Sequence, residues 1–293
     1  MPIAILGPTA SGKSSLAVAL AECIRGTVVN GDPFQALAGL AIGTGQPGLL
    51  EQAGVSHVGY GLLPLSTRPN PVSFGELVQG WLSASREPVL VTGSGLYLRG
   101  IWGQLSALPE VPETIVVRVR GWGARLGMPV LHRYLASVDP LRASALHPHD
   151  RARVQRALAL HLATGAAPSD LLLGGGSSVP AGWRVLVVAP GRESRRQRVA
   201  ARVAAQVRAG WPEEVARLLA EGHGLDLEAL RPLGYDRWRN ESDPASVAAQ
   251  IVCDTQAYAK RQATWFRNQL PFAETWDPDA ESLEVAFSRL GLS

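Results

Sequence analysis

The stretch Gly7-Pro-Thr-Ala-Ser-Gly12-Lys13-Ser14 decides the fold, because it fits the pattern G-x-x-x-x-G-K-[ST] at every fixed position. A compact apolar run, residues 2–6, precedes it, and helical periodicity follows over residues 13–24. Strand, glycine-rich loop and helix in this order are typical of a loop whose backbone N–H groups surround a phosphate at a helix N-terminus. The motif therefore predicts a diphosphate or polyphosphate site.

Within this loop, Lys13 supplies a mobile positive charge, and the Ser14 hydroxyl is the expected ligand of Mg²⁺. A glycine-rich turn without a ligand is the alternative. The predicted phosphate contacts are Gly7, Thr9, Ala10, Ser11, Gly12, Lys13 and Ser14.

Further apolar runs, at residues 27–30, 88–92 and 184–189, alternate with helical patterns. This alternation predicts an α/β fold with a parallel sheet flanked by helices, as in P-loop NTPases, and with a helical C-terminal part. Helical patterns dominate residues 108–167, and a Gly/Ser/Pro-rich linker follows over residues 174–182. We therefore expect a core of residues 1–107 and 183–293, with a helical insertion and linker over residues 108–182.

The composition agrees with a globular protein, since 46% of the 293 residues are apolar and 18% are charged. The net charge of +3 does not by itself indicate a nucleic-acid partner. No apolar run approaches the length of about 18 residues that spans a bilayer, so we expect a cytoplasmic protein without membrane contact. Cys23 and Cys253 lie far apart in apolar helical patterns, where we expect them to be buried.

Lysine occurs only at Lys13 and Lys260, whereas 26 basic residues are arginine. Codon or habitat bias explains the general preference. The two remaining lysines then mark positions where a compact ammonium does what a planar guanidinium does not.

Asp32 follows the strand at residues 27–30 and is the one carboxylate well placed to reach the phosphate loop. A P-loop kinase or hydrolase normally places a second, Mg²⁺-linked carboxylate at a strand end, and the strand at residues 88–92 ends Thr-Gly-Ser instead. Asp32 is therefore a metal partner, a general base or a substrate holder. A helix N-cap is the alternative role.

Eight motifs in order resemble the tRNA dimethylallyltransferase family, of the compact bacterial type, over nearly the whole chain. They are Gly7 to Ser14, Asp32-Pro-Phe-Gln35, Ile42-Gly-Thr44, Gly93-Ser-Gly-Leu-Tyr-Leu98, Asp139-Pro140 with His147-Pro-His-Asp150, Arg153-Val-Gln-Arg-Ala-Leu158, Leu233-Gly-Tyr235, and Tyr258-Ala-Lys-Arg-Gln262 with Thr264-Trp-Phe-Arg267.

The resemblance implies transfer of a dimethylallyl group from dimethylallyl diphosphate, with Mg²⁺, to N6 of the adenosine 3′-adjacent to the anticodon in tRNA. The phosphate loop would then hold the diphosphate leaving group, and the insertion would grip the anticodon stem. It implies Asp32, Lys13 and Ser94 as catalytic residues and Arg202 as a further diphosphate contact. A monomer is expected.

The resemblance also implies a set of tRNA contacts. Arg153 and Arg156 lie in the insertion, whereas Lys260, Arg261 and Trp265 combine cations with an aromatic ring, as RNA loops require. Solvated or salt-bridged helix faces are the alternative. The expected contacts are Asp32, Pro33, Phe34, Gln35, Ser94, Arg153, Gln155, Arg156, Arg231, Tyr235, Lys260, Arg261, Gln262, Trp265 and Arg267.

The chain departs from the family pattern at several positions near the expected site. They are Pro33, Leu37, Ala38, Gln46 and Gln256. Loss of cations there would weaken diphosphate binding or alter the choice of substrate. Two other functions remain open from the residues alone: a small-molecule or nucleotide kinase, and an RNA-binding protein that has the fold without the activity.

Overall fold

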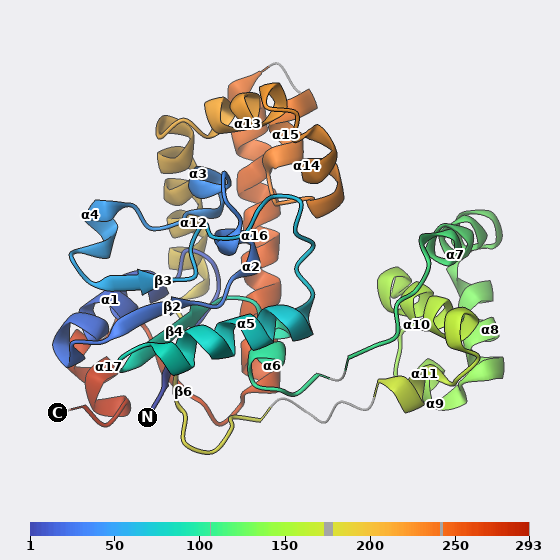
Figure 1. Cartoon of the computed structure of the whole chain (residues 1–293), viewed down its shortest axis with the longest axis horizontal. Helices are drawn as coiled ribbons and strands as arrows, with labels where there is room; N and C mark the ends of the chain where they lie inside the picture. The colour runs from blue at the N-terminus through green and yellow to red at the C-terminus, as the bar shows by residue number, and fades with distance from the viewer. Residues whose placement is uncertain (106, 173–177, 241–242, 293) are drawn as a thin grey trace. The chain divides into compact units, whose positions relative to one another are not determined.

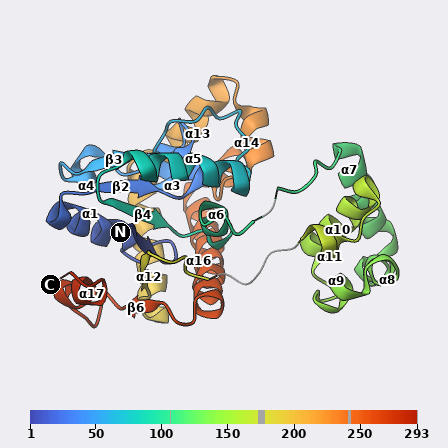
Figure 2. The same cartoon turned by 60° about the horizontal axis from the view of Figure 1, so that its bottom comes forward.

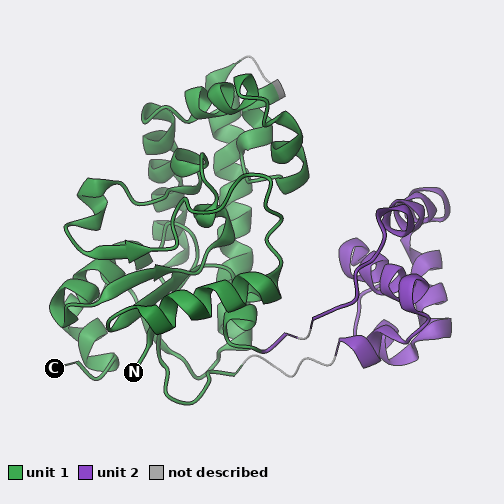
Figure 3. Ribbon diagram, in the orientation of Figure 1, with its two compact units in different colours: residues 1–103, 176–293 green, residues 104–175 purple. Residues whose placement is uncertain are grey.

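The computed structural model describes residues 1–105, 107–172, 178–240 and 243–292. The chain divides into two compact units, Met1–Gly103 with Gly176–Ser293, and Gln104–Gly175 (Figure 3). We call them the core unit and the insertion unit. The linker predicted over residues 174–182 lies partly outside the described residues.

A six-stranded parallel sheet with strand order β3-β2-β4-β1-β5-β6 forms the centre of the core unit (Figures 1 and 2). The predicted α/β class is thereby confirmed. The strands are β1 (Ile3–Leu6), β2 (Thr27–Asn30), β3 (Ser56–Val58), β4 (Pro88–Thr92), β5 (Arg184–Val188) and β6 (Glu274–Trp276). The edge strands β3 and β6 were not predicted, because three residues are too few for a readable apolar pattern.

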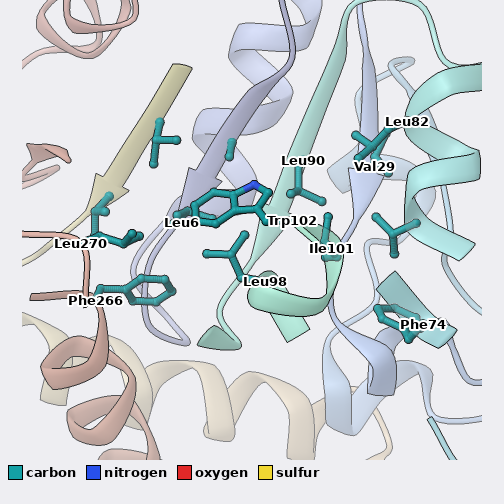
Figure 4. Packing of buried hydrophobic residues seen from close by; sticks show 14 of the residues in the cluster. Leu6, Val29, Phe74, Leu82, Leu90, Leu98, Ile101, Trp102, Phe266 and Leu270 are labelled. Atoms are coloured by element: carbon teal, nitrogen blue, oxygen red, sulfur yellow. The ribbon is translucent and has the colours of Figure 1, made fainter. Parts of the chain in front are cut away.

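Side chains of the central strands alternate between two apolar layers, as the two-residue period of a strand requires. Ala4 and Leu6 of β1 face one core, with α5 (Pro71–Ala84), α6 (Gly95–Ile101) and the end of α16 (Pro244–Gln269). Figure 4 shows Leu6, Leu98, Trp102 and Phe266 grouped in this core. The opposite layer contains α1 (Lys13–Ile24) and α17 (Leu283–Arg289).

A third apolar cluster lies away from the sheet. It joins Leu37 and Leu40 to α12 (Arg192–Arg208), α13 (Trp211–Ala220), α14 (Gly224–Leu230), α15 (Tyr235–Asn240) and α16. Its short neighbours are α2 (Pro33–Ala36) and α3 (Ala41–Thr44), whereas the short helix α4 (Leu49–Gln52) contributes no residue to it. This packing holds the chain that follows β2 against the helices of the C-terminal half.

The insertion unit has an apolar core of its own, in which Leu131, Leu135 and Leu158 are buried. Its helices are α7 (Glu113–Leu126), α8 (Met128–Val138), α9 (Pro140–Ser144), α10 (Arg151–Thr164) and α11 (Pro168–Leu171). Helix α10 ends at Gly165 in the left-handed region (φ 73°), as expected for a C-terminal glycine.

The prediction that the two cysteines are buried was wrong. Cys23 and Cys253 are both exposed, because the buried stripes of their helices pass through other positions, such as Leu20 and Ala21 in α1 and Ile251 and Thr255 in α16. Among the described residues, no helix is both long and apolar enough to cross a membrane.

Candidate active site

The phosphate loop connects β1 to α1 and depends on two glycines. Gly7 has φ 149°, and a Cβ placed there would lie 2.6 Å from the carbonyl oxygen of Val188 on β5. Gly12, with φ 93°, lies at the N-cap position of α1. Both positions exclude larger residues, so the loop keeps its backbone close to the sheet and turned toward the helix N-terminus.

The loop leaves hydrogen-bonding groups available for an anion. Within the described part of the chain no side chain caps α1, and the buried Ser11 hydroxyl has no partner. The Lys13 ammonium donates to the carbonyl oxygen of Pro8 at 3.3 Å, so it lies folded back over the loop. Uncapped N–H groups, the helix dipole and an ammonium together form a site for phosphate oxygens.

Asp32 is held at the end of β2 by its neighbours. Its backbone N–H donates to the Asn30 side chain at 2.8 Å, and Asn30 in turn donates to the carbonyl oxygens of Asp32 and Gly59. The Asp32 carboxylate accepts the N–H of Phe34 at 3.0 Å and caps α2. Capping and chemistry are therefore compatible roles, since one carboxylate oxygen caps the helix while Asn30 fixes the backbone that carries the half-buried Asp32 side chain.

The charged groups of the site perturb one another. Burial raises the pKa of Asp32, while the Phe34 hydrogen bond and the Lys13 and Arg202 charges act in the opposite direction. Burial lowers the pKa of Lys13 to about 8, and the nearby Arg202 charge adds to this effect. Burial also raises the pKa of Tyr97 to about 12, with a further contribution from Asp32. An acid and a lysine with shifted pKa values beside a phosphate loop are typical of a catalytic site.

Two arginines of α12 reach this region. Arg202 donates to the carbonyl oxygen of Thr44 at 2.9 Å and occupies the space beside Gly45. Arg198 lies beside the loop, because a Cβ at Gly12 would be 3.6 Å from its Nη1. Arg198 also pairs with Asp279. The family resemblance implied Arg202 as a diphosphate contact. Arg198 precedes it by four residues and so lies on the same face of α12, a spacing that could have identified it as a second cation.

The loop after β4 is linked to β2 and to α6. The Thr92 hydroxyl donates to the carbonyl oxygen of Gly31 at 2.8 Å and accepts the N–H of Ser94 at 3.2 Å. Ser94 occupies the N-cap position of α6 without capping it through its side chain. These bonds hold the carboxyl ends of β2 and β4 together. Asp32 and Ser94, which follow these strands, therefore lie in one region at the carboxyl ends of the strands.

Gln262 joins the phosphate loop to the β4 loop. Its Oε1 accepts the N–H of Thr9 at 2.8 Å, and its Nε2 donates to the carbonyl oxygen of Gly93 at 2.9 Å. The side chain is buried. Trp265, one turn further along α16, packs so closely on Gly95 that a Cβ there would be 2.2 Å from the indole. In this structure both residues therefore organise the site from within.

The other predicted RNA contacts differ in exposure. Tyr235 and Pro33 are buried, and Gln35 donates to the carbonyl oxygens of Thr44 and Gly45. Phe34 and Gln155 are partly buried. The exposed members are Arg153 and Arg156 of the insertion unit and Arg231, Lys260, Arg261 and Arg267 of the core unit.

The residues around the loop are compatible with an Mg²⁺ ion that takes most of its ligands from the substrate. Among the described residues, no group of three His, Cys, Asp or Glu side chains is arranged to bind a metal. Mg²⁺ usually keeps several waters and takes its other ligands from one or two protein oxygens and from phosphates. The exposed Ser14 hydroxyl, in the first turn of α1, is such an oxygen.

Known proteins resemble the chain over nearly its full length. A family model described as IPP transferase matches residues 35–269, and one described as isopentenyl transferase matches residues 2–58. A tRNA dimethylallyltransferase of Rhodospirillum centenum is 38% identical, covering 94% of this chain and 92% of that protein. Another, of Methylobacterium radiotolerans, is 39% identical, covering 96% and 94%.

Solved structures share the fold. A full-length tRNA isopentenylpyrophosphate transferase of Bacillus halodurans has a TM-score of 0.67 at 26% identity, covering 99% of this chain and 96% of that one. A eukaryotic dimethylallyltransferase, captured acting on tRNA, has a TM-score of 0.74 at 21% identity, covering 97% and 77%, and shows the fold alone. With a phosphate loop, a half-buried acid and these relatives together, the chain belongs to the IPP transferase family of prenyl-transferring enzymes.

Proposed function

We propose that this chain transfers a dimethylallyl group from dimethylallyl diphosphate to N6 of the adenosine 3′-adjacent to the anticodon in tRNA. The observation that carries the proposal is the combination of one oriented acid, Asp32, with Lys13 and Arg202 beside an uncapped phosphate loop. The related tRNA dimethylallyltransferases supply the reaction type.

In the proposed reaction, the adenine N6 attacks the allylic C1 carbon, and the C–O bond to the diphosphate breaks. Asp32 accepts the proton that N6 loses, and the electron pair of the broken bond leaves with the diphosphate. An aromatic amine is a weak nucleophile, so a carboxylate that orients and deprotonates it assists the attack. The raised pKa makes Asp32 a better proton acceptor than an exposed carboxylate.

The leaving group requires positive charge that is in place before the bond breaks. The loop amides, the Lys13 ammonium and the guanidinium groups of Arg198 and Arg202 supply it. When bound, Mg²⁺ held by Ser14 and the diphosphate would neutralise further phosphate charge. A hydroxyl at Ser94 lies at the edge of the same region, where it would contact the substrate.

We propose the exposed arginines as contacts to the tRNA backbone, with Arg153 and Arg156 of the insertion unit among them. The target adenosine must leave the anticodon-loop stack to reach Asp32, at a cost of a few kcal/mol that new contacts must offset. A tRNA substrate places the reaction in the cytoplasm. We also propose that the enzyme acts as a monomer.

The test is mass spectrometry of nucleosides from tRNA incubated with the protein, Mg²⁺ and dimethylallyl diphosphate. We expect N6-dimethylallyladenosine in digests from the wild type and none without dimethylallyl diphosphate. No product from a folded protein that still binds tRNA would support a non-catalytic RNA-binding role instead. Transfer of phosphate from ATP to a small molecule would support the kinase alternative.

A further inference from the structure

Glu214 of α13 is a buried carboxylate, 6% exposed, which none of the described ion pairs includes. Its oxygens accept three hydrogen bonds instead. The N–H of Ile42 donates at 2.8 Å, the N–H of Gly43 at 3.1 Å and the hydroxyl of Tyr235 at 2.6 Å. A carboxylate that is buried without a cation is tolerated only when it accepts such hydrogen bonds. The arrangement therefore fixes the three donors against Glu214.

Helix α3 is therefore held from several sides. Glu214 accepts from its N–H groups, and Gln206 of α12 donates to the carbonyl oxygens of Ile42 and Gly43 at 2.8 and 3.0 Å. The ring of Trp211 lies directly against Gly43, where a Cβ would be 2.2 Å from the indole nitrogen. These contacts fix the position of α3 against the third apolar cluster.

The other end of α3 faces the active site. The carbonyl oxygen of Thr44 accepts from Arg202 at 2.9 Å and from Gln35 at 3.0 Å, and that of Gly45 accepts from Gln35 at 2.7 Å. Gln35 belongs to α2, the helix that Asp32 caps. The carbonyl groups at the end of α3 thus orient one cation of the site and the helix that carries the acid.

We propose that Glu214 and Tyr235 are positioning residues, which place α3 so that its C-terminal carbonyl groups hold Arg202 and α2 in the geometry that diphosphate binding and proton transfer require. This inference rests on the proposed function and adds residues that do not touch the substrate. It also gives a role to the buried Tyr235, for which the family resemblance implied a contact with tRNA.

A loosened α3 would act on the site through Arg202. The charged and titratable groups that influence Asp32 or respond to it are Lys13 of α1, Arg202 of α12, Tyr97 of α6, Tyr258 of α16 and Tyr60 of the loop after β3. Of these, Lys13 and Arg202 oppose the raised pKa of Asp32. Movement of Arg202 away from Asp32 would shift the acid limb of the activity profile toward higher pH.

The test compares Glu214→Gln and Tyr235→Phe with Glu213→Gln, a neighbouring exposed carboxylate. Calorimetry with inorganic diphosphate and Mg²⁺ measures the site without tRNA. We expect Kd to rise about tenfold in Glu214→Gln, a few-fold in Tyr235→Phe and less than twofold in the control. In turnover assays, KM for dimethylallyl diphosphate should rise and the acid limb should move up, while KM for tRNA stays within about twofold.

The two positions should also be coupled, so that Tyr235→Phe adds little to Glu214→Gln. Unchanged diphosphate affinity and an unchanged pH profile in both folded variants would overturn the proposal, as would an equal loss toward both substrates. If Glu214→Gln does not fold, Tyr235→Phe decides by the same criteria. A wild type that binds diphosphate but forms no prenylated tRNA would refute the proposed function, whereas the calorimetric comparison would still test the positioning.

Discussion

The core unit and the insertion unit use charge in opposite ways. The insertion unit has eight arginines and five acidic residues, whereas the rest of the chain has 20 basic and 20 acidic residues. The entire net charge of +3 therefore falls on residues 104–175. In the core unit, Asp32, Lys13 and Glu214 are wholly or partly buried and bonded to neighbours, whereas Arg153 and Arg156 of the insertion unit are exposed.

This difference follows from what each unit is proposed to do. A catalytic centre needs a few charges at fixed positions, with pKa values shifted by burial. A surface that binds a phosphate backbone needs many exposed cations, each of which contributes modestly and depends on salt. If the two uses of charge are separable, a substitution in one unit should alter the properties of that unit and leave those of the other unit unchanged.

The largest effect is expected for Asp32→Asn. Asparagine is an equally good N-cap, so the fold should remain, while loss of the base should lower turnover about 10²- to 10⁴-fold. Affinity for tRNA without dimethylallyl diphosphate should stay within about twofold. Single-turnover assays and tRNA binding measure the two quantities, with the exposed Glu76→Gln as the control. Substantial activity in Asp32→Asn would remove the acid from the mechanism.

A pH titration of diphosphate binding tests the role of the Lys13 ammonium. Lys13 has a pKa of about 8 because burial disfavours its charged form, so it loses its proton as the pH rises through 8. Affinity for inorganic diphosphate should then fall by up to about tenfold per pH unit above this value. Lys13→Met should bind diphosphate more weakly and should not show this loss of affinity at high pH. The pH profile of this variant also corrects for titration of diphosphate itself. Parallel pH profiles of the two proteins would contradict the assignment.

The insertion unit contains one buried carboxylate of its own, Asp139. It accepts the N–H of Arg142 at 2.8 Å and that of Ser169 at 2.6 Å. Burial alone would raise its pKa, but these hydrogen bonds outweigh burial, and the pKa is lowered. The stabilisation is therefore present above the unfolded pKa of about 4 and is lost as the pH falls through the folded value.

Asp139→Ala should destabilise the insertion unit by about 1–3 kcal/mol, because two backbone donors lose their partner. Hydrogen exchange followed by mass spectrometry should show faster exchange in residues 107–172 and no change in the core unit. The exposed Glu110→Ala serves as the control. Diphosphate affinity should be unaffected, and its loss would show that the units are energetically coupled.

The sequence predicted those parts of the molecule that depend on local signals. The loop between β1 and α1, the strands β2 and β4 and the helices α1 and α10 lie where they were predicted, since glycines, apolar runs and helical periodicity mark their ends. The strands β3 and β6 depend on pairing at the sheet edges and carry no such pattern. The contacts of Gln262 with Thr9 and Gly93 join residues 253 and 169 positions apart, so only the folded chain reveals them.

The departures from the family pattern illustrate the same limit. Pro33 suits its place in the first turn of α2, where its missing N–H is of no consequence. Gln46 donates to the carbonyl oxygen of Leu37 at 2.8 Å, so an internal bond occupies the position of the absent cation. Ala38 is exposed. Sequence patterns identify such substitutions, but their effect depends on the neighbours that the fold provides.

The smallest effect is expected for the double substitution of Arg153 and Arg156 by alanine. If both contact tRNA phosphates, affinity for tRNA should fall several-fold, and the slope of log Kd against log salt should decrease by about 1 to 2. Diphosphate affinity and the rate at saturating tRNA should not change. Alanine at Arg86 and Arg217, two exposed arginines of the core unit, is the matched control. An equal loss in both double variants would mean that tRNA responds to total charge, and the contrast between the two units would then have no part in recognition.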